Sequence, residues 1–470
     1  MESHKTIPLL PSQVDVEHGE VDNVIRDPYG RPLFPEPTTD KLDPLNWPTW
    51  RKHVIIFMVC YGYFMMMYCN TAPVIAFVQL QSQFNASYSE INWTFAAGNL
   101  GATVGPLFFS AMGEIIGRRP VMILGTLLGL IGTGWSSAHG ISIESYALAR
   151  FSQVFGTTPA ITVGLAIIND LSWQHERGFR VGLWVLAIDT SCYLGPLFGS
   201  FLATYSQYWV EYHIVILLAI LLIGQIAFLP ETLYPRATIV SLGRDVDLAS
   251  INIKRTSQLP FLNFKKIGGV YHPKPWATVV IFFKMFAHPV IVLPVLAFSF
   301  FAYWWIISIV TLVPIAYPDR SLIGQGVMFI GLLVGTLMAE ALVSGRLGDH
   351  IIGRATARGD LPQTPEMRIW MGYPGVLLFA AGILTWGFAI ENKYHIMISQ
   401  LGFFLVGAGF QMTNTVIVAY AIDNCPDATM DITTFYSVFR ALLLPGSSPI
   451  GKRLKVARPF NLREKFMQDR

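Results

Sequence analysis

Three charged residues lie inside stretches of sequence that are otherwise apolar: Arg150, Asp189 and Glu340. An ionised side chain at the centre of a membrane costs about 3 kcal/mol on insertion scales, so such residues face a cavity or a partner and often mark an ion or substrate pathway. A buried carboxylate can exchange protons, bind a cation or form an ion pair. These three residues are therefore our candidates for substrate binding or proton coupling.

Each candidate also has a structural alternative. Asp189 lies about eight residues into its apolar stretch, too deep for a short side chain to reach water outside a cavity. It can titrate, bind a cationic substrate, pair with Arg150 as its natural partner, or make a purely structural polar contact. Arg150 can instead be a snorkelling arginine at a helix end, and Glu340 can instead pair with loop arginines.

The sequence lacks the residue patterns that are typical of enzymes. Its histidines form no i, i+4 pair, and it has neither a phosphate-binding glycine loop with lysine nor a nucleophile elbow. The cysteines have no metal-ligand spacing and are expected to be reduced packing thiols: Cys60, Cys69, Cys192 and Cys425. We predict a protein that is not an enzyme and uses no metal or cofactor. Energy would come from an ion gradient, with protons as the expected ion, or from substrate alone.

The elements that must position the charged residues are membrane-spanning helices. The chain is 53% hydrophobic but only 13% charged, and its mean hydropathy is +0.47. Stretches long enough to cross a ~30 Å hydrocarbon core lie at 54–78, 93–112, 121–138, 146–168, 181–204, 213–229, 289–313, 325–344, 370–390 and 396–420. None alternates with a period of two, so helices fit them and a barrel does not. The predicted fold class is an all-α polytopic membrane protein.

Lysine and arginine are distributed unequally between the loops. With a cytosolic N-terminus, the inside loops hold sixteen of them, while the outside loops hold only Arg320 and Lys393. Because basic loop residues favour the cytosolic side, we predict this orientation. The net charge of +3 then reflects topology, and no nucleic-acid partner is expected.

The spans divide the chain into two halves. We expect a solvated cytosolic N-terminal tail without a cleaved signal peptide, a six-helix N-terminal bundle, a cytosolic linker, an incomplete C-terminal bundle and a basic C-terminal tail. Their respective ranges are 1–52, 53–230, 231–288, 289–447 and 448–470.

A charged turn interrupts both halves at matching places. "SAMGE" at 110–114 ends the second span and "GRLGD" at 345–349 ends the eighth, and a glycine–arginine pair follows each acid. The carboxylate of such a turn can meet the positive N-terminal end of a neighbouring helix and pair with arginine. We interpret the charged residues of these turns as a conformational gate: Glu114, Arg118, Arg119 and Asp349.

Glycine and proline interrupt the fifth span at Gly195, Pro196 and Gly199. Proline removes a backbone hydrogen bond, and glycine lets neighbouring helices approach closely. We predict a kink that shapes a cavity, with simple packing as the alternative.

Several of these motifs together resemble the major facilitator superfamily, specifically its fungal branch of twelve-helix drug:proton antiporters. The matching stretches are "DPLNWPTWRK" at 43–52, "GEIIGRRP" at 113–120, "RFSQVFG" at 150–156, "LGPLFGS" at 194–200 and "PET" at 230–232. The resemblance covers about residues 43–440. It implies two six-helix bundles around a central substrate cavity that opens alternately to each side.

The chain departs from this pattern near its end. After "DITTFYSVFRALLLP" the resemblance implies helices 11 and 12, but the sequence turns to a tail with seven lysines and arginines and two acids. The segment 432–445 contains Arg440 and is too short to cross. We therefore expect about ten complete transmembrane helices plus a cytosolic stub, as in a truncated gene product.

The resemblance and the intramembrane charges predict a secondary active transporter that exports small amphipathic or cationic compounds, such as drugs, toxins or secondary metabolites, in exchange for protons. The alternatives are a nutrient or polyamine importer of the same fold and an inactive truncated relative. The expected partners are a small-molecule substrate, protons and the lipid bilayer. The expected state is a monomer in the plasma membrane.

Two acceptor patterns for N-glycosylation lie in the first predicted outside loop, at Asn85 (Asn-Ala-Ser) and Asn92 (Asn-Trp-Thr). Asn92 adjoins the second span, so Asn85 is expected to be the better acceptor.

Overall fold

The computed structural model describes residues 40–234, 276–300, 304–317, 319–341, 372–424 and 429–442, with isolated positions at 33–35, 38, 236, 239, 274, 366, 369 and 370. Every regular element in this part of the chain is a helix, which confirms the all-α prediction. Two residues of interest in the sequence, Asp349 and Cys425, lie outside the described residues.

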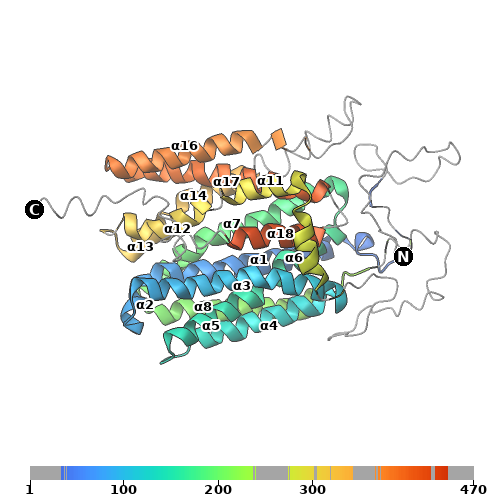
Figure 1. The fold of residues 1–470 in the computed structure, drawn as a ribbon, viewed down its shortest axis with the longest axis horizontal. Helices are drawn as coiled ribbons and strands as arrows, with labels where there is room; N and C mark the ends of the chain where they lie inside the picture. Colours follow the sequence, from blue (N-terminus) through green and yellow to red (C-terminus); the bar gives the residue numbers. More distant parts are fainter. Residues whose placement is uncertain are drawn as a thin grey trace, which may run out of the picture.

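The first half of the chain forms long helices that run roughly parallel to one another (Figure 1). They are α1 (Thr49–Thr71), η2 (Ala72–Ala76), α2 (Phe77–Phe84), α3 (Tyr88–Ile115), α4 (Arg118–Ser136), α5 (Ile143–Thr157), α6 (Pro159–Leu171), α7 (Gln174–Ala203) and α8 (Gln207–Phe228). A short 3-10 helix, η1 (Pro44–Asn46), precedes them. Proline at the start of α6 separates it from α5, and the two helices together fill one expected span.

The second half contains α10 (Ala277–Met285), α11 (Pro289–Phe298), α12 (Trp304–Ala316), α13 (Leu322–Val327), α14 (Ile330–Ala339), α16 (Gly372–Glu391), α17 (Ile396–Asn424) and α18 (Thr429–Leu442). Within the described residues, helices occupy all ten ranges expected as spans. In the part of the chain that the structure describes, seven stretches of helix are long and apolar enough to cross a membrane, and an eighth is counted if the bent pair α10–α11 is one span. α3 and α4 are not among them, although they have 28 and 19 residues, because polar and charged residues lower their hydropathy.

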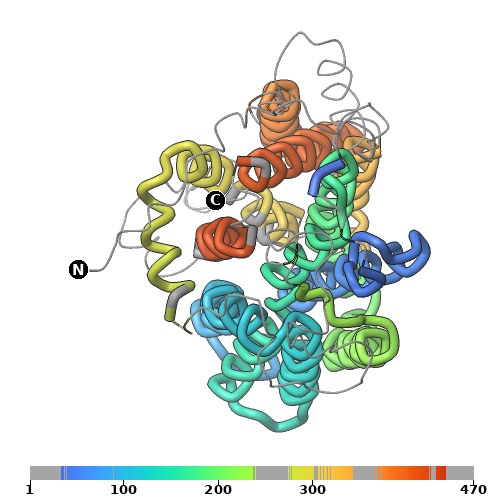
Figure 2. Tube along the Cα trace, turned by 90° about the vertical axis from the view of Figure 1, so that its right-hand side faces the viewer, coloured from blue at the N-terminus to red at the C-terminus, as the bar shows by residue number. Residues whose placement is uncertain are grey.

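The two halves lie side by side, and α7 and α18 pack where they meet (Figures 1 and 2). α7 contacts α1 of its own half and α13, α14 and α17 of the other half. α18 contacts α3 and α6 of the first half and α11 of the second. We call this contact region between the halves the seam. Below, the Gly117 face is the end of the bundle that carries the α3–α4 turn, and the Asn85 face is the opposite end, which carries the α2–α3 connection (Figure 1).

The segment around residue 440 forms a short helix. Residues 429–442 lie within the range expected for the incomplete C-terminal bundle and form α18, and most of its described side chains are buried. The stub expected after the ten spans is thus, for these residues, a buried helix. A 14-residue helix that is too short to cross a membrane can still be buried between longer helices.

Part of the expected solvated tail is also packed against the helices. The side chain of Asp43 is fully buried and forms an ion pair with Arg236 at 2.6 Å (Nη2 to Oδ1). Lys52 donates a hydrogen bond to the Leu45 carbonyl at 2.8 Å. Burial raises the pKa of Tyr234 to about 12, and its hydroxyl donates to Asp40 at 3.2 Å. The segment before α1 is therefore fastened to the residues that follow α8.

Candidate functional site

Asp189 lies on α7 at the seam, and its side chain has no exposed surface. Its carboxylate accepts two hydrogen bonds from the second half of the chain. Asn414 of α17 donates to Oδ2 at 2.7 Å, and Arg440 of α18 donates to Oδ1 at 3.2 Å. The candidate acid is therefore a contact between the two halves.

Tyr436 completes this arrangement from α18. Its hydroxyl donates to the Asn414 side-chain oxygen and accepts a hydrogen bond from Arg440 at 3.3 Å. Tyr436 and Arg440 are four residues apart, so both point from the same face of α18. We call Asp189, Asn414, Tyr436 and Arg440 the Asp189 cluster. It combines one carboxylate, one guanidinium cation and two neutral hydrogen-bonding groups, and all four side chains are buried.

Glu340, at the end of α14, lies next to the same face of α7. Its Oε2 accepts hydrogen bonds from Gln411 at 2.9 Å and Thr415 at 3.1 Å, both on α17. A Cβ added to Gly182 would lie 2.2 Å from Glu340 Oε1, so the carboxylate reaches the α7 backbone only because residue 182 is glycine. Gly182 and Asp189 are seven residues, or two turns, apart on α7. α7 thus carries one carboxylate at the seam, Asp189, and meets a second one, Glu340, from the other half.

Arg150 does not pair with Asp189. Its guanidinium is fully buried in the first half, where it donates to the Cys69 carbonyl at 2.6 Å and the Asn70 carbonyl at 3.0 Å. It also donates to the side-chain oxygen of Gln153, one turn along α5. The snorkelling alternative is excluded because the guanidinium is inside the protein. The expected Asp189–Arg150 pair is wrong, because in the described residues the ion pair of Asp189 is with Arg440.

Gln153 links Arg150 to an acid that the sequence reasoning missed, Glu211 of α8. The Gln153 amide donates to Glu211 Oε2 at 3.2 Å and to the Thr133 hydroxyl at 3.0 Å. Ser136 donates to Oε2 at 3.0 Å, and the Tyr146 hydroxyl donates to Oε1 at 3.1 Å. We call Glu211, Gln153, Arg150, Ser136 and Tyr146 the Glu211 cluster. It joins a buried cation to a buried acid through one amide.

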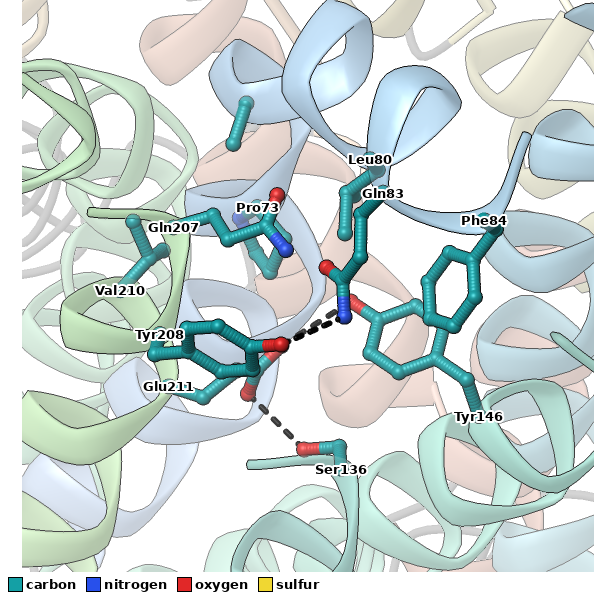
Figure 3. Close-up of a pocket in the computed structure, with 11 residues that line it drawn as sticks. Pro73, Leu80, Gln83, Phe84, Ser136, Tyr146, Gln207, Tyr208, Val210 and Glu211 are labelled. Carbon is teal, nitrogen blue, oxygen red and sulfur yellow. Dashed lines mark hydrogen bonds between the residues drawn. The ribbon is translucent and has the colours of Figure 1, made fainter. Parts of the chain in front are cut away.

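A small pocket adjoins the Glu211 cluster near the Asn85 face (Figure 3). Its lining comes from η2, α2, the end of α4, α5 and the start of α8. Gln83 and Tyr208 approach each other across it and share a hydrogen bond of 3.0 Å, while Ser136 and Tyr146 point at Glu211 (Figure 3). The pocket therefore brings polar groups close to the Glu211 carboxylate.

The charged turn at the Gly117 face is built differently from the expectation. The carboxylate at the N-terminal end of α4 belongs to Glu231, which accepts from the backbone N–H groups of Arg118 at 3.1 Å and Arg119 at 3.2 Å. Glu114, which was expected to have this role, lies at the end of α3. Gly117 has a φ of 108°, and a Cβ there would lie 2.5 Å from Glu231 Oε2. Glycine is thus required by both the backbone conformation and the close carboxylate.

The two arginines of this turn bind other parts of the first half. The Arg118 guanidinium pairs with Asp170 and donates to the Ala166 carbonyl at 3.0 Å. The Arg119 guanidinium donates to the Ile226 carbonyl at 3.0 Å. These contacts tie α4 to α6 and α8. Their role as a gate remains a hypothesis, and the second turn with Asp349 lies outside the described residues.

The glycines of the fifth span bring α7 close to α1. A Cβ on Gly195 would lie 2.3 Å from the Thr71 hydroxyl, and one on Gly199 would lie 2.5 Å from the Ala72 carbonyl. α7 is a single helix from Gln174 to Ala203 and contains Pro196. The close approach of helices expected from these glycines is thus observed at both positions, and the kink stays a prediction.

The two glycosylation candidates differ in local structure. Asn85 is exposed and ends α2 with a φ of 47°, whereas Asn92 lies within the first two turns of α3 and is half-buried. The backbone around Asn85 is thus the more accessible of the two.

The sequence identified four of the buried charges but not all of their partners. Asp189, Arg150 and Glu340 were named as site residues, and Arg440 was noticed only as an obstacle to a span. Glu211 was missed because the sixth span was expected to begin at residue 213, whereas α8 begins at Gln207. A test for acids just outside an expected span would have found it.

A sequence model of the Major Facilitator Superfamily matches residues 58–445. The chain is 23% identical to "Uncharacterized transporter mfc1" of Schizosaccharomyces pombe over 407 residues, which cover 82% of this chain and 80% of that protein. It is also 23% identical to "Probable efflux pump mfs2" of Aspergillus flavus over 370 residues, which cover 77% of this chain and 85% of that protein.

The fold is similar to that of the proton:xylose symporter XylE bound to 6-bromo-6-deoxy-D-glucose. The TM-score is 0.60 and the sequence identity is 16%, over 87% of this chain and 90% of that one. At this identity the likeness shows the fold alone.

Proposed function

Because this chain belongs to the major facilitator superfamily, whose model matches residues 58–445, we propose that it exports small amphipathic or cationic compounds in exchange for protons. As a transporter of this superfamily, it is a multi-pass integral membrane protein. The similarity to a probable efflux pump of Aspergillus flavus supports export as the direction. We propose that it acts as a monomer in the plasma membrane.

The observation that carries the proposal is the position of Asp189 at the seam. Its carboxylate is buried on the first half and held by Asn414 and Arg440 of the second half. An acid in this position can bind a proton or a cationic substrate, but not both at once. This mutual exclusion is the requirement for exchange.

The Asp189 cluster also couples binding to opening of the seam. Arg440 neutralises Asp189 in the present arrangement. A proton on Asp189, or a cation beside it, removes the attraction for the guanidinium. Because the two residues belong to different halves, loss of their ion pair weakens a contact that holds the halves together. Ligand binding and alternating access then follow from the same charge.

The Glu211 cluster supplies a second acid near the Asn85 face. We infer that the Gly117 face is cytosolic, in agreement with the distribution of basic loop residues, and that the Asn85 face is external. The pocket beside Glu211 is then on the side from which protons enter during export (Figure 3). Glu114, Arg118, Arg119 and Asp349 remain the proposed gate on the cytosolic side.

The test is accumulation of labelled cationic and amphipathic compounds in cells with and without this chain, at two external pH values. We expect lower accumulation with the chain, and a stronger effect at acidic external pH. Asp189→Asn should abolish this pH-dependent decrease in accumulation. Asp319→Asn, which removes an exposed acid, should behave as the unmodified chain. Both variants are checked for equal surface abundance.

Two results would contradict parts of the proposal. Higher accumulation in cells that contain the chain would show import instead of export. Normal pH-dependent transport by Asp189→Asn would show that Asp189 is a structural residue and that coupling resides elsewhere.

A further inference from the structure

α10 is oriented differently from the spanning helices. The segments Thr278–Met285 and Pro289–Phe298 meet at an angle of 88°. Figure 2 shows α10 along the outside of the bundle, running from α11 towards α3. Since α11 runs along the direction of the spans, α10 lies close to the plane of the membrane. Only three residues separate α10 from α11, so it cannot lie far from the membrane boundary.

The inner face of α10 packs on α18. The Phe282 ring lies 5.6 Å from the Phe435 ring and 6.0 Å from the Phe439 ring, measured between centroids. Phe286, which follows the helix, contacts the same two rings at 5.4 and 5.5 Å. α10 also contacts α3, so it touches a helix of each half at the seam.

The outer face of α10 is apolar and exposed. Trp276 is 63% exposed and Phe283 is 65% exposed, and between them Val279 and Val280 are 40% and 47% exposed. These positions follow the spacing i, i+3, i+4, i+7, which places them on one face of a helix. Such a stripe in water would be unfavourable, and in the described residues no other helix covers it.

Lysine lies at both ends of this stripe. The Lys274 ammonium lies 5.6 Å from the Trp276 ring centroid, and Lys284 is exposed in the last turn of α10. Apolar and aromatic side chains between two lysines, on a helix parallel to the membrane, are typical of helices that lie at the headgroup boundary. Lysine also provides charge complementarity to an anionic headgroup.

We propose that this face of α10 binds anionic phospholipid in the leaflet at the Gly117 face. Trp276 and Phe283 contact acyl chains, and Lys274 and Lys284 contact the headgroup. Phe282 on the inner face of α10 contacts Phe435 of α18, so lipid bound on the outer face influences the position of α18 through this contact. Because α18 carries Arg440 of the Asp189 cluster, lipid bound at α10 stabilises the arrangement of the seam in which Arg440 and Asp189 are paired. Lipid binding itself is independent of the proposed transport function.

The first experiment measures depth. A nitroxide is attached to the cysteine of the Phe283→Cys variant of the full chain, and the labelled protein is reconstituted in phosphatidylcholine vesicles that contain phosphatidylserine. The unmodified chain, treated with the same label, provides the background signal. We expect collisions with dissolved oxygen to exceed collisions with a water-soluble nickel complex. The reverse ratio would place Phe283 in water and overturn the proposal.

The second experiment measures lipid affinity in detergent. Short-chain phosphatidylserine should raise the Tm of the full chain, and the concentration for half of this shift should increase about fivefold for each lysine removed by Lys274→Gln or Lys284→Gln. Lys393→Gln, at the Asn85 face, is the matched control and should leave the titration unchanged. Added salt should weaken the effect in the unmodified chain.

Three outcomes of the second experiment would contradict a lipid site on α10. Equal titrations for the α10 variants and the unmodified chain would show that the two lysines are not part of a lipid site. An equal effect of Lys393→Gln would show general charge attraction. The same Tm shift with water-soluble glycerophosphoserine would show a site for the free phosphate group and no role for the acyl chains.

Discussion

Arg440 donates a hydrogen bond to Asp189 at 3.2 Å, although the two residues are 251 positions apart and belong to different halves of the chain. Both side chains are buried, with exposed fractions of 5% for Arg440 and none for Asp189. A buried ion pair contributes little compared with an apolar pair, but removal of one partner leaves an uncompensated charge. The pair therefore makes the contact between the halves sensitive to the charge on Asp189.

The first prediction is that Arg440→Gln destabilises the protein more than the double variant Asp189→Asn/Arg440→Gln. The single variant leaves the Asp189 carboxylate buried without its cationic partner, although Asn414 still donates a hydrogen bond to it, at a cost of about 3–5 kcal/mol. The double variant has no buried charge at this position. Thermal unfolding in detergent measures both. If the single variant is as stable as the unmodified chain, the Asp189–Arg440 ion pair is not formed in solution.

The second prediction concerns proton coupling through Glu211. Glu211→Gln retains the size of the side chain but cannot ionise, so transport should lose most of its dependence on external pH. Tyr146→Phe removes one hydrogen bond to the same carboxylate but leaves the carboxylate in place, and should retain that dependence. The measurement is transport rate against external pH at equal surface abundance. Identical profiles for Glu211→Gln and the unmodified chain would exclude Glu211 from coupling.

Local patterns in the sequence predicted the helices and much of the buried charge. Apolar stretches of spanning length leave few alternatives to helix, and the depth of Asp189 in one of them already required a partner. The partner could not be predicted, because Arg440 lies in a short segment and its distance from Asp189 depends on how the halves pack. The role of Glu231 could not be predicted for the same reason. Its carboxylate reaches the start of α4 from a residue 113 positions away.

The third prediction is that Gly199→Ala reduces the stability of the protein. A Cβ at residue 199 would lie 2.5 Å from the Ala72 carbonyl oxygen, so α7 and η2 must separate, at a cost of about 1–3 kcal/mol. Gly134→Ala is the matched control, because a Cβ there meets nothing within 4 Å. Alanine also favours helix over glycine, so the control should be neutral or slightly stabilising. Equal Tm values for the two variants would show that α7 does not require this close approach.

The fourth prediction separates Glu231 from Glu114 at the Gly117 face. Glu231→Gln should lower stability by about 1–2 kcal/mol, because the carboxylate accepts from the N-terminal N–H groups of α4 and interacts favourably with its dipole. Glu114→Gln should instead slow transport while leaving substrate affinity nearly unchanged, as expected for a latch of one state. Unfolding and substrate titration measure the two effects. If Glu114→Gln mainly weakens substrate binding, the gate interpretation fails.

The last prediction tests the orientation of the chain through glycosylation. Asn85 is exposed, lies between α2 and α3, and is followed by Ala86 and Ser87, so its side chain is accessible to a modifying enzyme if the Asn85 face is lumenal during synthesis. Protein made in eukaryotic cells should therefore migrate faster on a gel after glycosidase treatment. Asn85→Gln should abolish this shift, whereas Asn92→Gln should retain it, because residue 92 lies in α3 and is half-buried. A shift that survives Asn85→Gln but disappears with Asn92→Gln would mean that Asn92 is the acceptor. In the membrane-embedded protein, α3 would then begin at a later residue than in this structure. No shift in the unmodified chain, together with a cytosolic signal from a reporter inserted at residue 85, would reverse the orientation and place the Gly117 turn outside.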